Sequence, residues 1–250
     1  MHSDGLFLTK KPTNNWNGFH LILPSVSISN VGQLAVDMLL HNLKDKVKKV
    51  SGIYDEALLP VTGKDHNGEI FESMEVFEAE NLKLVIIQQR APFIKGRIPS
   101  FRQRLLAWIE RCQFKKVTIL SSVSSHVKTD ADLNESSPFR FLCNKDTIRK
   151  ELVSKHQWIE YSVKKLLEHK GSLELPGSGI AKSLYEDSES QNIPFVVCLV
   201  FCNHGDSRKE LRVAMQHLQQ YLNLEWALGE LSEPSHWKIQ SAYDNELMIF

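Results

Sequence analysis

The sequence predicts an α/β fold: a single domain in which a mainly parallel central sheet is flanked by helices on both faces. Apolar runs of strand length alternate with amphipathic segments of helical period along most of the chain. The run at 82–89 is apolar nearly throughout, which is typical of strands covered on both faces. Nothing between residues 15 and 225 resembles an interdomain linker. We therefore expect one domain over 1–228, with a loose segment at 1–16 and an irregular tail over 229–250.

The first third of the chain is expected to begin with a strand at 19–23, where every residue but one is apolar. A helix should follow from Val31, with Asn30 as its N-cap. Gly32, at the start of this helix, would let the helix approach the sheet closely. The next elements are expected to be a basic turn, a strand closed by Pro60, a loop and a short edge strand, at 44–49, 50–59, 62–69 and 74–77.

The remaining elements follow from the same reasoning. Strands are expected at 82–89, 116–121, 139–143 and 193–202. Helices are expected at 99–111, 146–167, 180–185 and 207–222, the first because Phe101, Leu105, Trp108 and Ile109 recur at helical spacing. Residues 121–137 are polar and predict a long, flexible loop.

Composition excludes several classes of function. Thirty basic residues balance thirty acidic ones, so no global field attracts the chain to nucleic acid or to an anionic membrane. No apolar stretch is long enough to span a bilayer, and the N-terminal residues lack the apolar core of a secretory peptide. The four cysteines are few and irregularly spaced, as in reduced intracellular thiols. We therefore expect a protein of the cytoplasm and nucleus.

Two glycine-containing loops are candidates for phosphate binding. The strand–loop–helix at 21–40 has the position of a dinucleotide loop, but Gly32 is its only glycine where the motif needs three. The segment 175–185 is the nearest approach to a Walker A loop, yet Pro176 and Ala181 occupy the two glycine positions. We therefore expect no nucleotide cofactor, although Gly177 and Gly179 leave open a small anion nest in a ligand-binding scaffold.

An enzymatic alternative rests on Ser121, Ser125 and His126, which crowd the expected carboxyl end of a strand, where sites of α/β sheets gather. These residues would make the chain a hydrolase or phosphorylase that retains a cleft there. The nucleophile motif G-x-S-x-G is absent, however, and the following residues have the composition of a solvated loop. We therefore favour a non-catalytic role.

The sequence offers no convincing metal site. Cys198 and Cys202 would lie about 13 Å apart on a strand and could not hold one ion together with His204. The remaining histidines and carboxylates show no H-E-x-x-H pattern. An α/β chain without nucleotide loop, nucleophile or metal cluster is more simply a binding protein.

The segment 90–104 is the best candidate for a partner-binding loop. Phe93 and Ile94 lie among basic side chains and could meet an acidic partner, with Phe93, Lys95 and Arg97 as the contact residues. A solvated loop would have the same composition. The other candidate anchors are tryptophans, each of which is more often found in a core: Trp108, Trp158, Trp226 and Trp237.

Four segments, taken together and in order, resemble the proteasome assembly chaperone 2 family. They are LILPSVSISNVGQLAVDML (21–39), QQRAPFIKGRIPSFRQRLLAWI (88–109), VTILSSVSSHVKTDADLNESSPFRFL (117–142) and LELPGSGIAKSLYED (173–187). The tripeptide WKI at 237–239 also fits. The order and spacing of these segments extend the resemblance from about residue 17 to 239.

This resemblance implies a non-enzymatic chaperone without cofactor, with an α/β fold distantly similar to that of nucleoside phosphorylases. It implies a heterodimer with proteasome assembly chaperone 1, which binds α-type proteasome subunits, helps to assemble the α-ring and blocks off-pathway ring dimerisation. The heterodimer leaves as the core particle matures.

The resemblance also implies a role for the C-terminus. Proteins of this kind use a terminal hydrophobic-Tyr-any signature that inserts into pockets between α subunits. This chain ends in Leu247, Met248, Ile249 and Phe250, so Ile249 stands where the tyrosine is expected. We expect an apolar tail of this kind to dock through Phe250 and the terminal carboxylate, without the phenolic hydroxyl.

Overall fold

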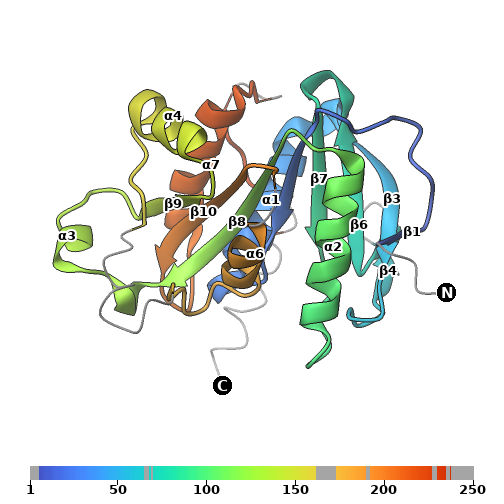
Figure 1. Ribbon diagram of the computed structural model, residues 1–250, viewed down its shortest axis with the longest axis horizontal. Coiled ribbons are helices and arrows are strands. Elements are labelled where there is room, and N and C mark those ends of the chain that lie inside the picture. Colours follow the sequence, from blue (N-terminus) through green and yellow to red (C-terminus); the bar gives the residue numbers. More distant parts are fainter. Residues whose placement is uncertain are drawn as a thin grey trace.

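A computed structural model of the chain describes residues 6–64, 68, 70–161, 173–189, 192–226, 230–234 and 237. It contains an eight-stranded sheet with helices on both faces, which confirms the predicted α/β class (Figure 1). In spatial order, the strands are β1 (Phe7–Leu8), β3 (Lys48–Tyr54), β6 (Met74–Ala79), β7 (Leu84–Gln89), β2 (His20–Pro24), β8 (Lys116–Ser124), β10 (Phe195–Cys202) and β9 (Phe139–Cys143).

The parallel part of the sheet lies in its middle. Strands β7, β2, β8 and β10 run parallel to one another. The antiparallel strands β6, β3 and β1 extend the sheet at one edge, and β9 closes the other. The carboxyl ends of the four parallel strands therefore meet at one end of the molecule, where α/β proteins usually place a ligand.

Two apolar cores lie between the sheet and its helices, one on each face of the sheet. One core packs α2 (Ile98–Cys112) and α6 (Ala181–Ser188) against the near face in Figure 1. The other packs α1 (Val31–Leu43), α4 (Asp146–His156) and α7 (Arg208–Leu222) against the opposite face. No helix among the described residues is both long and apolar enough to cross a bilayer.

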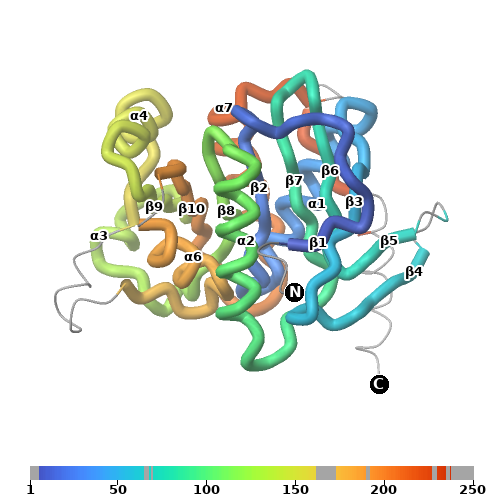
Figure 2. The backbone as a smooth tube through the Cα atoms, turned by 45° about the vertical axis from the view of Figure 1, so that its right-hand side comes forward, coloured from blue at the N-terminus to red at the C-terminus, as the bar shows by residue number. Residues whose placement is uncertain are grey.

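Several predicted elements need correction on the antiparallel side. Residues 62–69 do not form only a loop, because β4 (Thr62–Lys64) pairs with β5 (Ile70–Glu72) in a hairpin beside the main sheet (Figure 2). Strand β6 lies between β3 and β7 and is not an edge strand. The strand expected to reach residue 59 ends at Tyr54, where Asp55 accepts a hydrogen bond from the Ala57 N–H and turns the chain.

The predicted start of α1 at Val31 is correct, but the predicted capping of the helix by Asn30 is not. Asn30 precedes the helix with a positive φ of 54°, and its side chain makes no capping bond. The role of Gly32 is confirmed: a Cβ at this position would overlap Leu120 O and lie 2.6 Å from Ser25 O.

The expected flexible loop at 121–137 is largely ordered. Strand β8 continues to Ser124, because its last residues pair with β10 as far as Cys202. A short 3-10 helix, Ser125–Val127, and α3 (Asp130–Leu133) follow. Thr129 and Asp132 form a capping box at the start of α3. Polar composition suggested a loop, but these hydroxyls and carboxylates are satisfied within the fold.

Parts of both end segments pack against the domain. Within the segment predicted to be loose, Leu6 is buried, β1 pairs with β3, and the indole N–H of Trp16 donates to Glu78 at 2.6 Å. In the predicted tail, residues 230–234 contact α1 through hydrogen bonds between Ser232 and Asn42. The helix expected at 146–167 ends at His156, and residues 162–172 lie outside the described part of the chain.

Candidate functional site

The chain's own residues fill the carboxyl ends of β2 and β8. The loop before α6 lies across them: the Ile28 N–H donates to Gly177 O at 2.9 Å, and the Ser124 N–H donates to Pro176 O at 3.1 Å. The hydroxyls of Ser25 and Ser121 both donate to Ser178 O, at 2.6 and 3.0 Å. This end of the sheet, where a phosphate would bind in a nucleotide enzyme, is packed with backbone.

Gly177 and Gly179 make this close contact possible because they lack a Cβ atom. Both have positive φ, 80° and 62°. A Cβ at Gly177 would overlap the Ile28 side chain, and one at Gly179 would overlap Val26 O and lie 2.6 Å from Ser25 Oγ. The two glycines therefore let the loop touch the segment after β2, which leaves their proposed role as an anion nest without support from geometry.

The structure does not bring the candidate catalytic residues together. Ser121 is buried in β8, and its hydroxyl is engaged with the Ser178 carbonyl. His126 is exposed, and within the described residues its ring makes no hydrogen bond to a serine. No nucleophile–base pair is thus formed by Ser121, Ser125 and His126 in this arrangement.

Three of the four cysteines, Cys143, Cys198 and Cys202, are buried free thiols. Cys198 and Cys202 lie on β10, and burial raises the pKa of both thiols. In the part of the chain that the structure describes, no three His, Cys, Asp or Glu side chains gather closely enough to hold a metal ion.

The arginines of the basic loop at 90–104 form ion pairs within the fold. Arg90 pairs with Asp37 at 2.6 Å, and Arg102 with Asp187 at 2.7 Å. Arg104 forms a bidentate pair with Asp55, at 2.7 and 2.8 Å.

The three predicted contact residues of this loop differ in how far their side chains are already engaged within the fold. Phe93 packs against Phe101, with ring centroids 4.8 Å apart, and Arg97 pairs with Glu56 at 2.9 Å. Lys95 is exposed and has no ion pair with any residue that the structure describes. Of the three, only Lys95 keeps a charge that is free for a partner.

The most apolar part of the described surface lies at the β1 edge of the sheet. Seven large hydrophobic side chains are exposed among the described residues, and five of them gather here. We call this group the apolar corner: Phe7, Tyr54, Leu59, Val61 and Ile70. Single exposed apolar residues are ordinary, but a group of five makes this corner the candidate protein-interaction surface.

A groove of about 290 Å³ runs through the apolar corner, between the β1–β3 edge and the β4–β5 hairpin. Its walls include Ile53, Tyr54 and Leu58 from the sheet side, and Val61 and Ile70 from the hairpin side. The volume suits one or two protruding side chains of a partner. No sequence pattern predicts this groove, because the exposure of side chains on β3 and β5 depends on how the hairpin packs.

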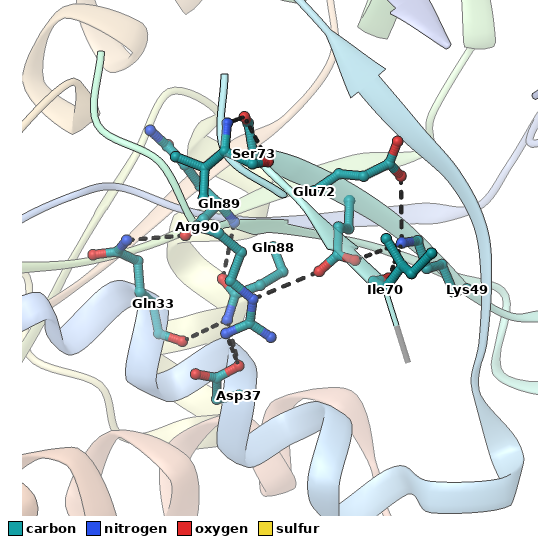
Figure 3. A network of polar contacts seen from close by, with 11 residues as sticks. Gln33, Asp37, Lys49, Ile70, Glu72, Ser73, Gln88, Gln89 and Arg90 are labelled. Carbon is teal, nitrogen blue, oxygen red and sulfur yellow. Dashed lines mark hydrogen bonds and ion pairs between the residues drawn. The ribbon is translucent and has the colours of Figure 1, made fainter. Parts of the chain in front are cut away.

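A chain of ion pairs holds the hairpin against the sheet (Figure 3). Lys49 on β3 contacts Glu75 at 2.6 Å and Glu72 at 3.3 Å, and it donates to Ile70 O at 3.0 Å. Glu75 is only 3% exposed and also contacts Arg90, at 3.5 Å. Burial lowers the pKa of Lys49, but the hydrogen bonds and charges of the two glutamates outweigh this effect and raise it. The network therefore fixes the wall of the groove that carries Ile70.

Away from the groove, three half-buried histidines gather: His20 at the start of β2, His156 at the end of α4 and His217 on α7. His20 Nε2 lies 2.7 Å from Thr118 Oγ1, and the rings of His20 and His156 both approach Tyr221, with centroids 5.8 Å away. His217 stacks on Phe139 at 4.3 Å. Lys116 lies over the Tyr221 ring at 4.0 Å, and burial lowers its pKa to about 8.

We expect the stability of the fold to decrease below pH 6.5 because of this cluster. Burial lowers the pKa of all three histidines. Among the neighbouring charges, Lys115, Lys116 and Lys155 lower these pKa values further, while Glu151 raises that of His156. The unfolded chain therefore binds more protons than the folded chain between the lowered pKa values and 6.5, so acid favours unfolding.

Urea unfolding at pH 7.5 and 5.5 measures this effect. The change in unfolding free energy between the two pH values should shrink in His20→Gln and stay unchanged in His126→Gln, because the second residue is exposed. Equal pH dependence in all three proteins would contradict the assignment to the buried cluster.

Comparison with known proteins gives a consistent result. The PAC2 family model matches residues 21–236. Proteasome assembly chaperone 2 of Nematostella vectensis is 34% identical over 226 residues, covering 84% of this chain and 91% of the relative. The proteins of the same name from Mus musculus and Homo sapiens are 31% and 30% identical, each covering 90% of both chains.

Solved structures share the fold at low sequence identity. PbaA of Pyrococcus furiosus, described as an archaeal homologue of proteasome-assembly chaperone, aligns with a TM-score of 0.69 at 14% identity, over 97% of this chain and 94% of its own. PbaB of the same organism, described as an archaeal proteasome activator, gives 0.69 at 12% identity, with 98% of both chains covered. At this level of identity the likeness shows the fold alone.

Proposed function

The chain belongs to the PAC2 family, and from this membership we propose that it is a proteasome assembly chaperone. The observation that carries the proposal is the match over residues 21–236, together with relatives of about 30–34% identity over most of the chain that bear this name. The filled strand ends support a role that does not depend on a bound nucleotide.

In finer detail, the chain pairs with a homologous chaperone, proteasome assembly chaperone 1, and the heterodimer binds α-type subunits. It promotes assembly of the α-ring and prevents two rings from associating off the pathway. We place this activity in the cytoplasm and nucleus. The resemblance described above supports these points, and the apolar corner supplies a surface that such binding requires.

The mechanism is the occupation of surface. A stable protein interface buries roughly 1,600 Å² and depends on a few well-packed apolar anchors at its centre. A chaperone bound in this way excludes a competing ring from the same surface. Release requires no hydrolysis, because a maturing assembly can displace the chaperone by mass action.

The predicted C-terminal contact is a separate part of the proposal. Leu247, Met248, Ile249 and Phe250 lie outside the described residues, so the proposed insertion rests on the sequence alone. Unchanged binding to α subunits after deletion of 247–250 would remove it from the account.

Reconstitution tests the proposed function. Purified α-type subunits are mixed with the homologous chaperone, with and without this chain, and ring species are separated by native electrophoresis. We expect single α-rings to increase and ring dimers to decrease in proportion to the added chain, up to a stoichiometric ratio. An unchanged distribution of ring species would oppose the proposal.

A further inference from the structure

Three described acidic residues around the apolar corner are paired with cations of the fold. Asp55 is held by Arg104 in a bidentate pair, and Glu56 by Arg97 at 2.9 Å. Glu72, which lines the groove, pairs with Lys49. These carboxylates therefore offer little net charge to an incoming protein.

Cations near the same groove are not neutralised. Lys10 and Lys11 follow Thr9, which lines the groove, and both are exposed. Lys95 is exposed beside Ile94, whose N–H donates to Ala57 O at 2.7 Å, next to the lining residue Leu58. None of these three lysines has an ion pair with a described residue. Among the described residues, the groove thus combines an apolar centre with nearby lysines that have no ion pair.

Among the described residues, no strand pairs with the outer edge of β1, which is the last strand of the sheet and contains two residues, with Phe7 60% exposed and Leu8 packed inward. The outer edge of such a strand presents backbone N–H and C=O groups to which a strand of another chain can pair, although two residues allow only a short stretch of pairing.

We propose that the apolar corner docks an extended segment of a different protein, in which apolar side chains alternate with carboxylates. The apolar side chains enter the groove between Tyr54 and Ile70, the segment runs along β1, and its carboxylates meet Lys10, Lys11 and Lys95. A second copy of this chain is disfavoured, because an isologous contact would bring the same lysines together. The inference rests on the proposed function, to which it assigns a surface and a partner chemistry.

Binding of the full-length chain to two separate probes, the purified homologous chaperone and purified α-type subunits, tests the inference. Tyr54→Ser combined with Ile70→Ser should weaken binding to one probe by about tenfold or more, which corresponds to about 1.4 kcal/mol. Both residues are at least 60% exposed, so folding should be retained. The matched controls are Leu133→Ser and Val153→Ser, which alter exposed apolar residues elsewhere and should leave affinity unchanged.

Charge reversal tests the rim independently. Lys10→Glu combined with Lys95→Glu should weaken binding to the same probe several-fold at low salt, with a smaller effect at about 0.5 M salt, where the Debye length is only about 4–5 Å. Lys150→Glu and Lys209→Glu, on exposed positions of α4 and α7, are the controls.

Three outcomes would overturn the inference. If the wild-type chain binds a probe and the corner variants bind it equally well, the inference fails while the proposed function stands. If the wild-type chain binds neither probe, both fail. A wild-type homodimer that Tyr54→Ser dissociates, seen by light scattering, would identify a second copy as the occupant instead.

Discussion

Replacement of Arg140 with alanine is expected to lower the free energy of unfolding by about 3–5 kcal/mol, the usual loss when one partner of a buried ion pair is removed. Arg140 lies on β9 and is 1% exposed. Its guanidinium donates to Asp132 at 3.0 Å and to the carbonyls of Ser137 and Phe139, at 2.8 and 2.7 Å. Alanine would leave the Asp132 carboxylate and two buried carbonyls without these donors.

Urea denaturation of the purified variant measures the loss. The double variant Arg140→Met with Asp132→Leu provides the control, because removal of both charges leaves no unpaired ion. The double variant should recover part of the stability lost in Arg140→Ala. If the single and double variants were equally unstable, or if Arg140→Ala cost less than about 1 kcal/mol, the buried pair would not contribute to stability in the way described.

Replacement of Gly32 with alanine should destabilise the fold by about 3 kcal/mol, the upper part of the range for overpacked cores. Helix propensity alone predicts the opposite, a gain of up to about 1 kcal/mol for alanine inside a helix. The new methyl group, however, would overlap Leu120 O on β8 and approach Ser25 O to 2.6 Å. Both are backbone atoms of the sheet region, so they cannot rotate away as a side chain would.

Thermal and urea unfolding of Gly32→Ala and Gly96→Ala distinguish packing from backbone strain. Gly96 has a positive φ of 82°, and a Cβ there would meet nothing within 4 Å. Gly96→Ala should therefore show only the cost of the backbone conformation, about 1 kcal/mol. A Gly32→Ala variant as stable as the wild type would mean that α1 does not contact the sheet as closely as described.

The order of helices and strands could be predicted from the sequence because most core elements carry a clear hydrophobic period. The apolar run of β7 and the helical spacing in α2 are examples. The serines of β8 were misinterpreted because their polarity suggested a loop. In the fold, Ser122 is buried and its hydroxyl is satisfied by Ser27 and Ile28, which lie 95 and 94 residues away in the chain.

The apolar corner could not be predicted from the sequence. The charges at 90–104 were visible in the sequence, but their acidic partners come from distant segments, such as Asp37 and Asp187. The apolar corner combines β1, β3 and the hairpin, and exposure of Tyr54 or Ile70 depends on their relative placement. A local sequence pattern contains no information about such contacts.

Affinity purification of the full-length tagged chain, followed by quantitative mass spectrometry, shows whether the chain acts by binding proteasome components. We expect a second PAC2-family chaperone and α-type subunits to be enriched together, in comparable molar amounts. Enrichment of neither, from cells in which both proteins are present, would mean that the chain does not act in this way.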